Sequence, residues 1–168
     1  MTDQLSLFSG QQPAPPAAPT TATRVIVRAQ QELGRGQQHQ EPEPPDFQTF
    51  TINLESRYAA DEQEADALAA ICATELKGYL FSARLLEIAH KAGRNPLYRN
   101  AREFTENQLK ELAEAIREAR SMADWMLSEC QNAFGEEDAE RLRQYAQACV
   151  DSVIGDEAPT DPEQPDLF

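Results

Sequence analysis

Three amphipathic patterns between residues 58 and 155 constrain the fold of this chain more than any other feature. In each pattern, apolar side chains recur every three or four residues, which places them on one face of a helix. The three stripes are Leu68, Cys72, Leu76, Tyr79, Ala83 and Leu86; Leu109, Leu112, Ile116, Ala119, Ala123, Met126, Cys130 and Ala133; and Ala139, Leu142, Ala146, Cys149 and Val153. Short connections between such helices predict an all-α fold, a small antiparallel three-helix bundle.

Local signals predict where these helices begin and end. The first helix is expected to begin near Tyr58 and to end at Gly93. The second follows a capping box, Thr105 to Gln108, and ends at Gly135, and the third ends at Gly155. Upstream of the first stripe, Asp61 and Glu64 resemble an N-cap with its reciprocal acid.

Small residues make the predicted core thin. Many stripe positions are alanine, so the helices can approach closely, and self-association could compensate for the limited apolar volume. Gly78 lies inside the first helix, where glycine costs about 1 kcal/mol relative to alanine. We therefore expect Gly78 to mark a close contact between helices.

The residues before the bundle are harder to interpret. Residues 9–22 are rich in proline and predict an extended linker, and residues 34–46 predict a loop. Residues 24–33 fit either a short helix or a strand. Alternation of Phe50, Ile52 and Leu54 with polar residues has strand periodicity, and we expect this piece to lie along the bundle or to pair with residues 24–28.

These patterns divide the chain into three parts. Residues 1–57 form a mostly disordered tail, residues 58–155 the bundle, and residues 156–168 a disordered acidic tail without any basic residue. The net charge of −14 disfavours binding of nucleic acid over a broad face. No apolar run is long enough for a signal peptide or a membrane span, so we expect a cytoplasmic protein.

No catalytic, cofactor or metal motif emerges from the sequence, and we expect a protein that is not an enzyme. Cys72, Cys130 and Cys149 lie far apart on the helical stripes, which predicts reduced core residues. His39 and His90 have no ligand or catalytic pattern around them.

The two ends of the chain carry almost the same short sequence. The N-terminal copy is Gln4-Leu5-Ser6-Leu7-Phe8, and the C-terminal copy is Gln164-Pro165-Asp166-Leu167-Phe168. A Leu-Phe pair in a polar, disordered segment is an exposed apolar anchor, which is typical of a docking peptide. The glutamine amide would fix the register by hydrogen bonds.

The N-terminal copy resembles the pentad through which bacterial replication and repair proteins bind the DNA polymerase sliding clamp, Gln-Leu-(Ser or Asp)-Leu-Phe. It agrees at every position, whereas Pro165 replaces the first leucine of the C-terminal copy. The resemblance implies that both copies dock on the clamp. It implies nothing about the helical part.

A basic stretch runs against the overall charge. Between Ile88 and Arg102 there is no acid, and Lys91, Arg94, Tyr98, Arg99 and Arg102 could touch nucleic acid or another partner by phosphate contact and stacking. The favoured alternative is that the arginines pair with the acidic helices and that Tyr98 packs on the bundle.

The leading functional hypothesis is a non-enzymatic clamp-binding accessory or regulatory protein in bacterial, phage or plasmid DNA replication or repair. Clamp binding could recruit another protein or displace the polymerase. The alternative is an acidic helical interaction module, such as a DNA mimic, an inhibitor or an antitoxin-like partner, without clamp binding. A third hypothesis is a nucleic-acid-binding module that acts through the basic loop.

Overall fold

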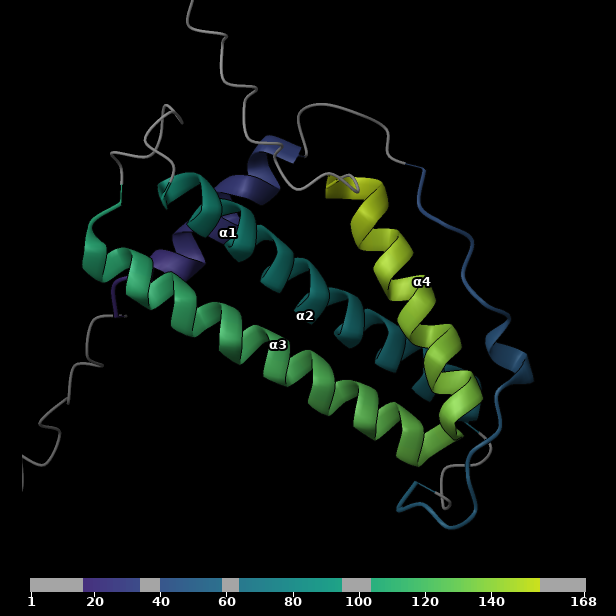
Figure 1. The fold of residues 1–168 in the computed structure, drawn as a ribbon. Coiled ribbons are helices and arrows are strands. Elements are labelled where there is room, and N and C mark those ends of the chain that lie inside the picture. The colour runs from purple at the N-terminus through teal and green to yellow at the C-terminus, as the bar shows by residue number, and fades with distance from the viewer. Residues whose placement is uncertain (1–16, 34–39, 59–63, 95–103, 155–168) are drawn as a thin grey trace, which may run out of the picture.

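The computed structural model describes residues 17–33, 40–58, 64–94 and 104–154, and these ranges form a helical bundle (Figure 1). Its elements are α1 (Thr21–Leu33), the short 3₁₀ helix η1 (Phe47–Thr49), α2 (Ala65–Arg94), α3 (Glu106–Phe134) and α4 (Glu136–Ile154). The all-α prediction is confirmed. The described ranges hold four α-helices rather than three, because the ambiguous stretch near residues 24–33 is also helical.

The long helices α2 and α3 run antiparallel, and α4 folds back beside α2 (Figure 1). The corner between α3 and α4 is a single residue, Gly135, as predicted from the sequence. Its φ of 90° lies in the region that favours glycine, and its N–H donates to the carbonyl of Gln131 at 2.8 Å. This tight corner brings α4 back against the bundle without a loop.

The capping box at the start of α3 is confirmed by both of its hydrogen bonds. The Gln108 amide donates to Thr105 Oγ1 at 3.3 Å, and the Thr105 amide donates to Gln108 Oε1 at 2.9 Å. Two amides that lack partners inside the helix are thereby satisfied, which fixes its first turn.

The first predicted helix begins later than expected. Tyr58 lies in a turn, and α2 begins at Ala65 and ends at Arg94, one residue beyond the predicted stop. Tyr58 nevertheless packs against the bundle, and its hydroxyl donates a hydrogen bond to the Glu129 carboxylate of α3 at 2.6 Å. Asp61 of the expected capping pair lies outside the described residues.

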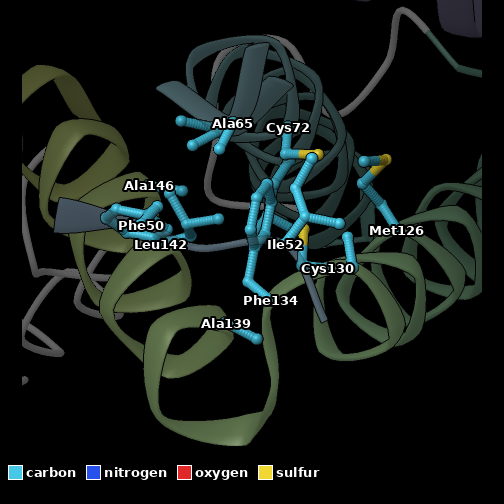
Figure 2. Close-up of a cluster of buried hydrophobic side chains, with 14 of the residues drawn as sticks. Phe50, Ile52, Ala65, Cys72, Met126, Cys130, Phe134, Ala139, Leu142 and Ala146 are labelled. Atoms are coloured by element: carbon cyan, nitrogen blue, oxygen red, sulfur yellow. The ribbon is translucent and has the colours of Figure 1, made fainter. Parts of the chain in front are cut away.

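The predicted stripes form the core. A main cluster joins α2, α3, α4 and the segment before α2, and Figure 2 shows most of its side chains. Its buried members are Phe50, Ile52, Ala65, Ala69, Cys72, Ala73, Leu76, Ala123, Met126, Cys130, Ala133, Phe134, Ala139, Leu142 and Ala146. Seven of these fifteen are alanine, which agrees with the thin core expected from the sequence.

Phe50 and Ile52 supply large side chains to this core although they come before α2. They are 3% and 4% exposed. The Phe50 and Phe134 rings pack edge to face, with 5.5 Å between their centroids. The segment is extended but pairs with no strand in the described ranges; instead the Asn53 amide donates to the Ala133 carbonyl at 2.7 Å. Of the two predicted placements, packing along the bundle is the one observed. Both residues precede residue 58, where we expected the packed domain to begin.

The helix α1 covers a second, smaller cluster at the other end of α2 and α3. Ala22, Val25 and Ile26 pack against the buried side chains of Leu86, Leu112 and Ile116. The Thr20 hydroxyl accepts from the Thr23 amide at 3.2 Å, and this bond caps the helix. The predicted linker therefore ends two residues early, at Thr20. A helix of 13 residues is marginal alone, so docking on this cluster stabilises α1.

Replacing Phe50 by alanine tests whether the segment before α2 belongs to the core. We expect Phe50→Ala to lower the free energy of unfolding by about 3–5 kcal/mol, because a fully buried ring is lost. Leu54→Ala is the matched control, since Leu54 lies four residues on and is 72% exposed, and it should change stability by less than about 0.5 kcal/mol. Urea denaturation of both variants measures this. Equal stabilities would show that Phe50 is not part of the core.

Candidate functional site

A cavity of about 460 Å³ lies between α2 and α4, beside the extended segment that contains Glu41. Its apolar wall consists of Gly78 and Phe81 from α2 and of Val150 and Val153 from α4. Its volume is within the range of about 300–1,000 Å³ that is usual for ligand sites.

The polar groups around this cavity have hydrogen-bond partners within the protein. Lys77 Nζ contacts Glu41 Oε1 at 2.7 Å, and the Tyr145 hydroxyl and the Cys149 thiol approach the same oxygen at 3.4 and 3.8 Å. The Thr74 and Ser152 hydroxyls donate to helix carbonyls at 2.9 and 2.8 Å. The cavity therefore offers mainly an apolar surface, which suits an aliphatic or aromatic side chain better than a charged ligand.

The electrostatics of this edge follow from the same contacts. The hydrogen bond and the charge of Lys77 lower the pKa of Glu41, which remains an anion at neutral pH. Burial raises the pKa of Cys149 and of Tyr145, so both remain neutral there. A protonated thiol is a poor nucleophile, and Cys149 is thus a neutral wall residue.

Gly78 opens directly onto this cavity. A Cβ added at Gly78 would meet no atom within 4 Å, so the close helix contact expected there is wrong. The glycine of α2 at a close contact is Gly93, where a Cβ would lie 2.9 Å from side-chain carbons of Leu109 and Phe104. An interior glycine was visible in the sequence, but whether it faces a neighbour or a cavity depends on tertiary packing.

The docking motifs predicted from the sequence, Gln4–Phe8 and Gln164–Phe168, lie outside the described residues. The basic stretch is described only in part. Lys91 and Arg94 lie in the last turn of α2, with both side chains exposed, whereas Tyr98, Arg99 and Arg102 lie outside the described ranges.

The three cysteines are free and buried, which confirms their prediction as reduced core residues. Cys72 of α2 and Cys130 of α3 meet in the main cluster (Figure 2). A hydrogen bond with the Cys72 sulfur, together with burial, raises the pKa of Cys130 and keeps this thiol protonated. In the ranges that the structure describes, no group of three or more His, Cys, Asp or Glu side chains could hold a metal ion.

Comparisons with known proteins give no relative: no family model, no curated protein and no solved structure matches this chain. Among the described helices, none combines the length and the apolar character that crossing a membrane requires.

Alanine substitutions at the two glycines of α2 are expected to change the free energy of unfolding in opposite directions. Gly78→Ala should raise the free energy of unfolding by up to about 1 kcal/mol, because alanine favours the helix and its methyl group enters open space. Gly93→Ala should lower it by about 1–3 kcal/mol, because the methyl group clashes with Leu109 and Phe104. Denaturant titration measures both, and each variant is the control for the other. Two changes of the same sign would contradict this assignment.

The Glu41–Lys77 pair predicts a pH effect. Because the folded-state pKa of Glu41 is lowered, the pair stabilises the protein fully above about pH 4.5, and this contribution is lost as the pH falls through the lowered pKa. Lys77→Met should therefore cost under about 1 kcal/mol above that pH, since both side chains are partly exposed, and progressively less below it. Urea titrations from pH 3 to 7 measure the difference. Arg117→Met, which removes the exposed 4.0 Å pair with Glu114, is the control and should show little effect at any pH.

Proposed function

We propose that this protein docks on the bacterial DNA polymerase sliding clamp and acts as a non-enzymatic accessory or regulatory protein in bacterial, phage or plasmid DNA replication or repair. The observation that carries the proposal is the pentad Gln4-Leu5-Ser6-Leu7-Phe8, which agrees with the clamp-binding pattern at every position. From ordinary residue usage, such a match arises by chance in roughly one chain of this length in a few thousand.

The chemistry of the pentad supports a weak, side-chain-driven contact. Leu7 and Phe8 each contribute roughly 1.5–3 kcal/mol when they are fully buried in a pocket, and part of this is lost to ordering of the peptide. Gln4 adds a directional hydrogen bond. One copy alone should therefore bind with an affinity in about the micromolar range.

The second copy, Gln164 to Phe168, offers a way to raise this affinity. The sliding clamp is a ring of identical subunits, so it presents the same pocket more than once. Two motifs on one chain can occupy two pockets, and the second binding event then profits from a high effective concentration. The helical bundle connects the two motifs, because α1 follows one and α4 precedes the other.

The acidic character of the chain favours a second candidate function. With a net charge of −14, the chain could act as an acidic interaction module without clamp binding. Ile71 and Trp125 are 59% and 50% exposed on α2 and α3, and they would be available to a protein partner. A purified clamp separates the two candidates, because only the first requires the terminal pentads.

The decisive experiment measures clamp affinity for the full chain and for motif variants by surface plasmon resonance. Leu7→Ala with Phe8→Ala should weaken binding at least tenfold, because both apolar anchors are removed. Leu167→Ala with Phe168→Ala should cost less, because Pro165 already replaces one contacting leucine. The four substitutions together should abolish binding.

Leu54→Ala is the matched control for these variants, since it also removes an exposed leucine and lies outside both motifs. It should bind the clamp as the wild type does. If the Leu7 and Phe8 variant binds as tightly as the wild type, Gln4 to Phe8 is not the main docking site and the proposal fails.

A further inference from the structure

The cavity between α2 and α4 exists partly because Gly78, in its wall, has no side chain to occupy the space. Gly78 faces open space, so no helix contact requires a glycine there, and any larger side chain would enter the cavity. The remaining wall is apolar, from Phe81, Val150 and Val153. The polar groups at its edge already have partners within the protein. This combination suits apolar side chains as occupants.

We propose that this cavity is the docking site for the chain's own C-terminal motif, with Leu167 and Phe168 inserted between α2 and α4. The functional consequence of this inference rests on the proposed function, because Leu167 and Phe168 are also the side chains that would bind the clamp. The cavity and the clamp would then compete for one motif.

The position of the tail favours this occupant. The last turn of α4, with Ser152 and Val153, is itself part of the cavity wall, and the tail continues from Ile154. A random coil with as many residues as 155–168 spans about 20 Å, which is enough to fold back onto that wall. Because the tether is short, the motif is present at roughly millimolar effective concentration, and even a weak contact is then populated.

The N-terminal motif is a poorer candidate for the same cavity. Thr21, at the start of α1, donates to Glu111 near the start of α3 at 2.9 Å. The helix α1, which follows the N-terminal motif in the chain, therefore begins at the cluster of Leu86, Leu112 and Ile116, away from the cavity beside the last turn of α4.

Charge at the cavity edge is compatible with an acidic tail. Glu41 is the one acid among the lining residues, and Lys77 neutralises it at 2.7 Å. The Lys77 side chain remains 35% exposed, so Asp166, next to Leu167, can lie near its ammonium group while the apolar pair enters the cavity. With its C-terminal motif held in this way, the protein would offer the clamp its N-terminal motif first.

The test uses the full chain without any clamp, by NMR spectroscopy. We expect nuclear Overhauser contacts between the Phe168 ring and the methyl groups of Val153, which is only partly buried, and a shift of these methyl resonances in the variant Leu167→Ala with Phe168→Ala. Gly78→Phe should abolish the contacts because its ring fills the cavity. Gly78→Ala is the matched control, since it alters the same position without filling the space, and should retain them.

Three results would overturn the inference. In the first, the Val153 methyl resonances are unchanged by removal of the Leu167 and Phe168 side chains. In the second, the contacts come from Phe8 instead. In the third, the contacts grow with protein concentration, which would assign them to the tail of a second copy. Since no clamp is present, each result leaves the clamp-binding proposal to its own affinity measurement.

Discussion

The close packing of α2 against α3 and α4 is the constraint on which the rest of the structure depends. Alanine and cysteine dominate these contacts, so the helices approach closely but bury little apolar volume between them. Phe50 and Ile52 compensate for this, because both add large buried side chains to the main cluster. The Phe50 ring packs against Phe134, where the α3–α4 corner closes. The guanidinium carbon of Arg141 lies over the Phe50 ring, 4.8 Å from its centroid. The same guanidinium donates to Asp138 Oδ1 at 2.8 Å.

The need to fill this core determines the course of the chain before α2. To place Phe50 and Ile52 in the main cluster, the preceding segment passes along α2 and α4, which brings Glu41 to Lys77 and to Cys149. The same course forms one side of the cavity at Gly78. The candidate site thus forms because the segment that supplies Phe50 and Ile52 to the core also lies beside α2 and α4.

The sequence predicts the features of this fold that arise from local interactions. The capping box at Thr105, the corner at Gly135 and the buried stripes depend on neighbours a few residues apart, and the structure confirms them. The helical state of α1 was open because Val25 and Ile26 favour a strand as readily as a helix, and the contact with Leu86 and Leu112 decides between them. The cavity could not be predicted, since it depends on how α4 and a distant extended segment meet α2. A glycine inside a helix, Gly78, indicates an unusual environment at that position, but the sequence does not show whether this environment is a helix contact or a cavity.

The folded part and the terminal motifs place opposite demands on the same apolar side chains. A docking motif needs Leu and Phe exposed to meet a partner, whereas exposed apolar side chains favour any hydrophobic contact that is near. A bundle with a thin core and an apolar cavity at the root of its own tail offers such a contact at high effective concentration. The C-terminal copy, which departs from the clamp-binding pattern at Pro165, follows α4 in the chain, and the last turn of α4 lines this cavity. The N-terminal copy, which agrees with the pattern, precedes α1, and α1 packs on the other cluster. Under our two proposals the motifs are therefore not equivalent: the N-terminal one agrees with the clamp-binding pattern at every position, and the C-terminal one follows the helix that lines the cavity.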